Sequence, residues 1–191
     1  GLADTHDKIL ARPGLFDIAL KAIKASKRQG FRVCTNTTVY KQTDPQEIRS
    51  LFGQLTDLDI DGLLVSPAYS FNGVDPEIFL SREEIKEKFT RLTRNAPKFP
   101  YFSTPLYLSF LRGEREYECT PWANPTRNPR GWRAPCYQIV DAHYPTFEEM
   151  MNSTPWENYG VGRDPRCSQC MMHSGFEPSV VCPISCRYSN S

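Results

Sequence analysis

Three features are absent or scarce in this sequence, and each absence narrows the function. No apolar run approaches the roughly 20 residues that a membrane-spanning helix needs. The first residues lack the basic start and apolar middle of a secretory signal. Lys plus Arg total 23 and Asp plus Glu total 22, which gives a formal net charge of +1. This balance argues against a nucleic-acid binder that relies on an overall positive field.

The chain is long enough to bury a core. Its 191 residues suit one large domain or two small ones, and 39% of them are hydrophobic. It starts at Gly1 rather than at Met, so we expect that further residues precede it in the intact protein.

The first part of the chain alternates helical and strand patterns. Residues 13–29 have the apolar spacing of a helix, and residues 31–40 alternate with the period of a strand. Asp44 and Pro45 are typical of a helix start, and a short apolar run then ends at Ser66. Residues 31–66 therefore predict strand, helix, strand, with the two strands parallel. Because two parallel strands do not form a stable sheet alone, further strands must come either from residues 70–191 or from upstream of Gly1. We favour the upstream origin.

Two more helices are predicted before the composition changes. One begins after Ser81, and the other spans about residues 104–112. After Glu116 the regular periodicity is lost, and prolines, tryptophans and cysteines become frequent. We place a domain boundary near residue 115 and expect a short helix to begin at Thr146.

Six of the seven cysteines lie in the second half of the chain. Cys167 and Cys170 form a C-x2-C pair, whose spacing lets two thiolates bind one metal from a tight turn. Cys119 and Cys136 belong to a C-x11-G-x4-C pattern. A zinc ribbon normally has two C-x2-C pairs, and four thiolates suit an iron–sulfur cluster equally well. Zinc, iron–sulfur, reduced structural thiols and disulfides all remain open at this point.

The cysteine pattern resembles a known family. C-x11-G-x4-C followed by C-x2-C is similar to the SPASM or twitch extension of radical S-adenosylmethionine (SAM) enzymes, which holds an auxiliary iron–sulfur cluster. The similarity is greatest to the adenosylhopane synthases of hopanoid biosynthesis. It rests on residues 117–128, 131–132, 135–137 and 167–178, and more weakly on residues 35–38 and 66–70.

The resemblance implies a fold and a reaction. The fold is α/β: residues 1–115 form the carboxyl-terminal half of a radical SAM (β/α) barrel, residues 116–180 form an irregular cysteine-rich, twitch-like extension, and residues 181–191 are a tail of uncertain structure. The intact bacterial enzyme, a transferase, cleaves SAM at a 4Fe–4S cluster and adds the 5′-deoxyadenosyl radical to the alkene of diploptene. The cluster's C-x3-C-x2-C motif is absent here. We therefore expect no catalytic residue and no activity from this chain alone.

The expected site residues follow from the same resemblance and from strand parity. Cys119, Cys136, Cys167 and Cys170 are the predicted metal ligands. Polar side chains near the carboxyl ends of parallel strands commonly contact ligands, so Asn36, Thr38 and Ser66 are predicted at the mouth that receives SAM and substrate. Ordinary strand-end hydrogen bonding explains these three equally well. Tyr69 could line the same mouth, but we favour an aromatic side chain packed on the core. His173, just after the C-x2-C pair, could be a ligand, but we favour a packing role for it.

The implied partners are SAM, the hydrocarbon diploptene and an electron donor such as flavodoxin or ferredoxin, with no nucleic acid. The implied location is the cytoplasm, peripheral to the inner membrane. Two features depart from the family: Ser174 stands where relatives carry a cysteine, and the tail with Cys182 and Cys186 does not resemble theirs. Two alternatives remain, another radical SAM/SPASM enzyme acting on a peptide or small metabolite, and a non-enzymatic zinc-binding interaction module.

Overall fold

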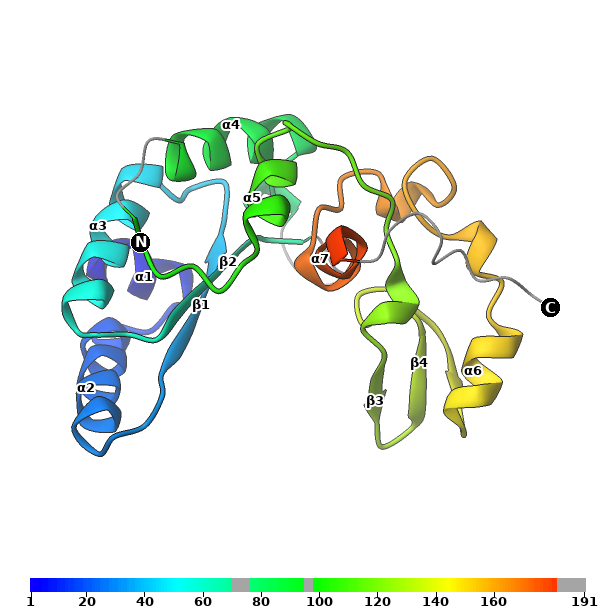
Figure 1. Cartoon of the computed structure of the whole chain (residues 1–191), viewed down its shortest axis with the longest axis horizontal. Coiled ribbons are helices and arrows are strands. Elements are labelled where there is room, and N and C mark those ends of the chain that lie inside the picture. The colour runs from blue at the N-terminus through cyan, green and yellow to red at the C-terminus, as the bar shows by residue number, and fades with distance from the viewer. Residues whose placement is uncertain (70–75, 95–97, 182–191) are drawn as a thin grey trace.

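A computed structural model describes residues 1–69, 76–94 and 98–181. This part of the chain forms two lobes, with the last helix between them (Figure 1). The helices, strands and short helical turns are α1 (Ala3–Ile9), α2 (Leu15–Arg28), β1 (Cys34–Val39), α3 (Pro45–Asp57), β2 (Gly62–Pro67), η1 (Pro76–Ile78), α4 (Arg82–Thr93), α5 (Pro105–Leu111), η2 (Pro121–Ala123), β3 (Thr126–Asn128), β4 (Gly131–Pro135), β5 (Val140–Tyr144), α6 (Phe147–Ser153), η3 (Trp156–Asn158), η4 (Pro165–Cys167) and α7 (His173–Val181).

The first lobe contains the expected strand–helix–strand unit. Strands β1 and β2 pair in parallel, with Thr38 opposite Ser66, and α3 connects them. A parallel bridge between Leu63 and Tyr101 continues the pairing on the far side of β2. The mixed α/β class is therefore confirmed. The described residues form two small sheets and no closed barrel.

The two faces of β1 are covered unequally. On the covered face, Phe52 of α3 is fully buried and meets Phe99 and Tyr101 edge-on, with ring centroids 5.7 and 5.9 Å apart. On the opposite face, Asn36 and Thr38 are exposed. Side chains alternate between the two faces of a strand, so the period-two pattern read from the sequence places the polar set on the open face.

Local capping explains why three helices begin where predicted. The carboxylate of Asp44 accepts the Gln46 N–H at the start of α3. Ser81 and Glu84 form a reciprocal capping box at α4, and the hydroxyl of Thr104 accepts the Tyr107 N–H at α5. Such caps satisfy backbone N–H groups that have no partner within the helix.

The second lobe contains an antiparallel sheet, β3–β4–β5, that the sequence did not predict. Its strands have only three to five residues, too few for a clear alternating pattern. Gly131 has φ +130, and a Cβ there would lie 2.5 Å from the Tyr144 carbonyl oxygen. Helix α6 begins after Thr146, as expected, and a small core of Ala134, Met150 and Trp156 lies beside the sheet.

Helix α7 joins the two lobes. The Phe176 ring stacks on Phe110 of α5 with centroids 4.6 Å apart, and both side chains are buried in the core of the first lobe. Residues on either side of the predicted boundary near 115 therefore share one core, and the boundary itself stays a prediction. No helix in the described ranges is long and apolar enough to cross a membrane.

We expect Phe52→Ala to lower the free energy of unfolding by about 3–5 kcal/mol, because it removes a fully buried ring and leaves a cavity. Phe31→Ala is the matched control, since that ring is 64% exposed. Its effect should stay within about 0.5 kcal/mol. Urea denaturation of both variants measures the difference, and equal losses would contradict this account of the core.

Candidate functional site

The four cysteines predicted to act together line a single cavity, which we call the cysteine cavity. They come from four places: the segment before η2, the residue after β4, the end of η4 and the segment before α7. All five described cysteines are free thiols. Cys182 and Cys186 lie outside the described residues. The remaining wall is mostly apolar or aromatic: Tyr69, Pro121, Asn124, Pro135, Tyr137, Gln138, Ile139, Tyr159, Gly160, Val161, Met172, Ser174, Gly175 and Phe176.

Cys167 and Cys170 are held in a hydrogen-bonded turn. The Cys170 N–H donates to the Cys167 carbonyl at 3.0 Å. Arg82, at the start of α4, donates from its guanidinium to the Cys170 carbonyl at 2.9 Å, and its backbone N–H donates to Gln169 at 2.9 Å. The first lobe therefore holds the C-x2-C segment in place.

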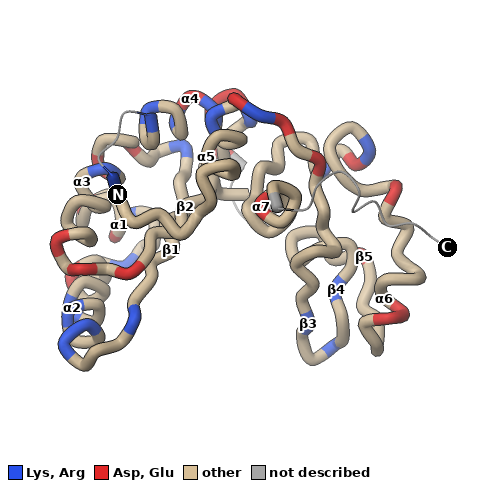
Figure 2. Tube along the Cα trace, viewed as in Figure 1, with Lys and Arg blue, Asp and Glu red and all other residues tan. Residues whose placement is uncertain are grey.

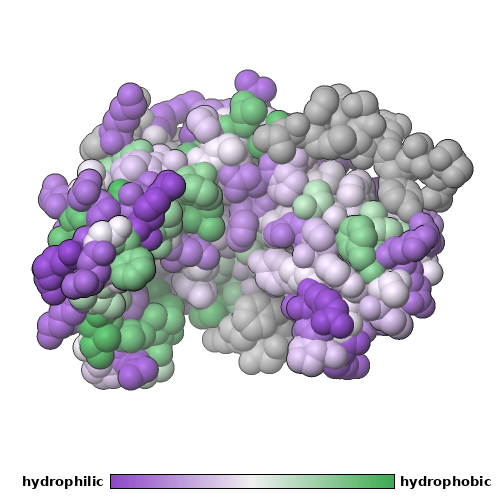
Figure 3. Space-filling model, turned by 60° about the horizontal axis from the view of Figure 1, so that its bottom comes forward, coloured by the Kyte–Doolittle hydropathy of each residue, from purple (hydrophilic) through white to green (hydrophobic). Residues whose placement is uncertain are grey.

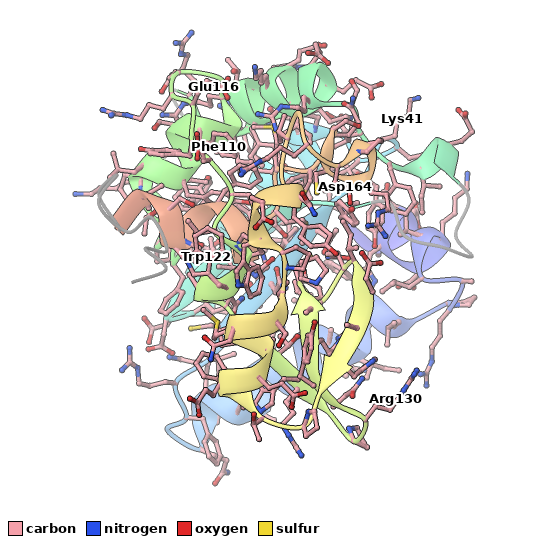
Figure 4. All side chains as sticks on the ribbon, turned by 90° about the vertical axis from the view of Figure 1, so that its right-hand side faces the viewer. Lys41, Phe110, Glu116, Trp122, Arg130 and Asp164 are labelled. Carbon is pink, nitrogen blue, oxygen red and sulfur yellow. The ribbon has the colours of Figure 1, made fainter. Side chains whose placement is uncertain are left out.

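An arginine clamp fixes the loop that leads into Cys167. The Arg166 guanidinium binds both carboxylate oxygens of Asp141 at 2.8 Å and one oxygen of Asp164 at 2.7 Å. These contacts lower the pKa of both carboxyl groups. The Tyr69 hydroxyl, beyond the end of β2, donates to the Arg166 carbonyl at 2.9 Å. Figure 4 shows Asp164 well inside the molecule and Arg130 at the tip of the β3–β4 hairpin, away from the clamp.

Cys119 lies directly against α7. The Thr120 N–H donates to the Gly175 carbonyl at 2.9 Å, which brings the two segments together. A Cβ on Gly175 would overlap the Cys119 Sγ. Glycine at position 175 therefore leaves the space that this sulfur occupies.

Cys136 directly follows the last residue of β4. Its Sγ accepts the Ile139 N–H at 3.4 Å, while its own N–H donates to the Ile139 carbonyl at 3.4 Å. This small loop sets the sulfur at the edge of the antiparallel sheet.

Burial keeps three of the thiols, those of Cys119, Cys167 and Cys170, protonated at neutral pH. It raises the pKa of Cys170 to about 12, and it raises the pKa of Cys119 and of Cys167 as well. Neighbouring thiolates would add mutual repulsion in the same direction. A metal that binds here must displace the thiol protons, and its positive charge would offset that repulsion.

The four thiols are a donor set that suits an iron–sulfur cluster in kind. In the described part of the chain, no three His, Cys, Asp or Glu side chains are placed to hold one metal ion. A tetrahedral zinc site gathers all its sulfurs at about 2.3 Å from one ion. Iron–sulfur clusters are likewise held by cysteine thiolates. The four thiols that line the cysteine cavity therefore offer the donor type that both kinds of site use.

Asn36, Thr38 and Ser66 also meet, at a second cavity of about 240 Å³ that we call the strand-end pocket. It lies at the carboxyl ends of β1 and β2. Neither of these strands contains a charged residue (Figure 2). Tyr69 lines this pocket as well. The other described lining residues are Tyr40, Pro67, Ala68, Ile78, Phe79, Tyr137, Gln138, Met172 and His173.

The two cavities share part of their walls. Tyr69, Tyr137, Gln138 and Met172 line both of them. The sequence did not predict that Tyr137 and Gln138, just after Cys136, would face the strand ends. Their position directly after Cys136, a predicted ligand, was the one feature of the sequence that could have indicated a place near the site.

Cys34 and Ser174 differ in their position relative to the cysteine cavity. Cys34 is exposed on the open face of β1, and it lines neither the cysteine cavity nor the strand-end pocket. Ser174 lines the cysteine cavity. Its hydroxyl faces the Tyr137 phenol, whose pKa is raised by burial and lowered in part by this contact.

Comparison with known proteins identifies one family. The family model for a domain of unknown function, DUF3463, matches residues 63–190. No curated protein and no solved structure matches the chain. The matched range begins at the second residue of β2 and includes all four cysteines of the cysteine cavity and α7.

Gly175→Ala should destabilise the protein, because the new methyl group overlaps the Cys119 Sγ. Overpacking of this kind costs about 1–3 kcal/mol. Gly53→Ala, in α3, adds the same methyl group where nothing lies within 4 Å, and should stabilise by about 0.5–1 kcal/mol. Urea denaturation tests the contrast in sign, and stabilisation by both variants would contradict the close contact at Cys119.

Iodoacetamide at pH 8 should modify Cys34 well before Cys170. Cys34 is exposed, whereas Cys170 is partly buried and its pKa is raised to about 12, so only roughly one molecule in ten thousand carries the Cys170 thiolate. Mass spectrometry of timed samples measures both rates. Equal rates in the folded protein would contradict the raised pKa of Cys170, and equal rates in urea provide the control.

Proposed function

This chain belongs to the DUF3463 family, and we propose that it is the carboxyl-terminal part of a radical SAM enzyme that makes adenosylhopane. The observation that carries this proposal is that Cys119, Cys136, Cys167 and Cys170 line one cavity. These are the four positions at which the sequence resembles the cluster-binding extension of such enzymes.

The cysteine cavity is the proposed seat of an auxiliary iron–sulfur cluster. Its four lining thiols are the proposed ligands, and Gly175 leaves room for the sulfur of Cys119. Such a cluster supplies one-electron transfer when bound. The surrounding apolar wall excludes water, and the Arg166 clamp holds the Cys167 turn against the sheet.

The first lobe is the proposed later half of the barrel. Two parallel strands, a parallel bridge beyond β2 and helices on one face support it. The open face, with Asn36 and Thr38 exposed, would then be the barrel interior. The strand-end pocket is the proposed mouth for SAM and substrate, since active sites of such barrels lie at the carboxyl ends of the strands.

The reaction proposed for the whole enzyme is addition of the 5′-deoxyadenosyl radical to the alkene of diploptene. The SAM-cleaving cluster and an electron donor such as flavodoxin or ferredoxin lie outside this chain. Because the substrate is a hydrocarbon, the proposal places the enzyme in the cytoplasm, in peripheral contact with the inner membrane. The mostly apolar cysteine cavity is compatible with an apolar substrate nearby.

Anaerobic reconstitution with iron and sulfide tests the cluster. The chain should take up roughly four irons and four sulfides, with the visible absorption of a 4Fe–4S cluster. Changing any one of Cys119, Cys136, Cys167 or Cys170 to Ser should lower the iron content by more than about half, because the cluster then lacks one of its ligands. Cys34→Ser is the matched control and should retain full loading, because Cys34 lines neither cavity.

The same preparation separates the alternatives. Zinc bound by the anaerobically purified chain, with no uptake of iron or sulfide, would favour a zinc-binding interaction module. Loss of iron from Cys34→Ser to the same extent as from the other variants would show that the cavity is not the site.

A further inference from the structure

Helix α2 has a second apolar stripe, on the side that faces away from the core. Its inward side carries Phe16, which is buried in the core that α2 shares with α3 on the covered face of β1. Ile18, Ala22 and Ala25 are exposed instead, and their spacing of four and three residues places them on one face of the helix. The outward side of a surface helix is normally charged or polar, so packing within the chain does not explain this stripe.

Phe31 adds an exposed aromatic ring at the carboxyl end of α2. Gly30 ends the helix in the left-handed conformation, with φ +79. Its N–H donates to the Lys27 carbonyl at 2.9 Å, and the Phe31 N–H donates to the Ser26 carbonyl at 3.1 Å. This glycine-centred cap fixes the backbone from which the ring projects, and 64% of Phe31 is exposed. Arg32, the next residue, is exposed as well.

A row of cations runs beside the apolar stripe. Lys21, Lys24 and Arg28 are exposed, and their spacing of three and four residues places them on one side of α2. Asp17 is the only acidic residue of the helix. Figure 2 shows Lys and Arg gathered along the carboxyl-terminal part of α2 and just before β1, and Figure 3 shows hydrophobic and strongly hydrophilic side chains next to one another on the first lobe. We call the apolar stripe, this row of cations and residues 31–32 together the α2 surface.

An anionic lipid bilayer matches the chemistry of the α2 surface. An interfacial helix buries its apolar side chains at the boundary between headgroups and acyl chains, while the Lys and Arg side chains beside them attract anionic lipids. Aromatic rings are enriched at the same depth. A second copy of the chain matches less well, because a symmetric contact would place Lys21, Lys24 and Arg28 of both copies against one another. Charge complementarity therefore favours the lipid.

We propose that the α2 surface binds the surface of an anionic lipid bilayer, with Ile18 and Phe31 entering the interfacial region. The use of this contact, to hold the enzyme where a hydrocarbon substrate is dissolved, rests on the proposed function. The two are geometrically compatible. The core side of α2 packs on the covered face of β1, so its outer side points away from the proposed barrel interior.

Co-sedimentation of the chain with lipid vesicles tests the proposal. The chain should bind vesicles of phosphatidylcholine that contain roughly one-third phosphatidylglycerol. It should bind pure phosphatidylcholine at least about tenfold more weakly, because each cation near an anionic surface contributes on the order of a factor of five. Raising the salt from about 0.1 M to about 0.5 M should remove most of this preference, because it shortens the range of the attraction from roughly 10 Å to roughly 4 Å.

Two variants and two matched controls locate the contact. Phe31→Ala should weaken vesicle binding about fivefold to tenfold, because it removes the apolar ring, and Lys24→Gln should weaken it about fivefold, because it removes one charge. Phe102→Ala removes a ring that is 66% exposed outside the α2 surface, and Arg130→Gln removes an exposed charge at the tip of the β3–β4 hairpin. Both controls should bind within about twofold of the original chain. Circular dichroism checks that all four variants are folded.

Three results would overturn the proposal: equal binding to the two kinds of vesicle, no loss of binding in Phe31→Ala and Lys24→Gln, or an equal loss in the two controls. A chain that binds no vesicle but forms a dimer that Phe31→Ala dissociates would also overturn it, and would assign the α2 surface to a second copy. Iron uptake by Phe31→Ala should equal that of the original chain. Iron uptake without vesicle binding refutes this inference alone, whereas Phe31-dependent vesicle binding without iron uptake refutes the cluster alone.

Discussion

The stacking of Phe176 on Phe110 is the contact on which the rest of the arrangement depends. The two rings lie 4.6 Å apart, and beside them the buried Tyr107 hydroxyl donates to the Met171 carbonyl at 2.8 Å. Such an aromatic pair contributes about 0.5–1.5 kcal/mol beyond the area it buries. These contacts hold the segment from Met171 to Phe176 against α5. Together with the hydrogen bonds of Arg82 to Gln169 and Cys170, they fix the C-x2-C turn and the amino end of α7 relative to the parallel strands.

Both cavities depend on this packing of the C-terminal segment against α5. Cys170 and Met172 flank the segment that Tyr107 holds, so one end of the turn faces the cysteine cavity while the next residues face the strand ends. Tyr69 ties the two regions from the other side through the Arg166 carbonyl. Because the cavities share walls, a change in the packing of one will alter the shape of the other.

The sequence predicted what is locally encoded. The caps at Asp44, Ser81 and Thr104 each act within one helical turn, and the period-two pattern placed Asn36 and Thr38 on the open face. It did not predict β3–β5, whose strands are very short, or α7, which contains Pro178. The joint position of the four cysteines was predicted from spacing and resemblance. The contribution of Tyr137 and His173 to the strand-end pocket depends on tertiary contacts, for which no local pattern exists.

At position 174 the chain has a residue that lines the cysteine cavity but carries no sulfur. Relatives are expected to carry a thiol there, and here a hydroxyl lines the cysteine cavity beside Tyr137. A serine hydroxyl at neutral pH is a far poorer metal ligand than a thiolate, since iron–sulfur clusters are held by thiolates. Ser174 thus lies against Tyr137, which lines both cavities, and the four cysteines of the cysteine cavity remain the proposed sulfur donors. In this chain Ser174 therefore links the two cavities through the tyrosine that they share.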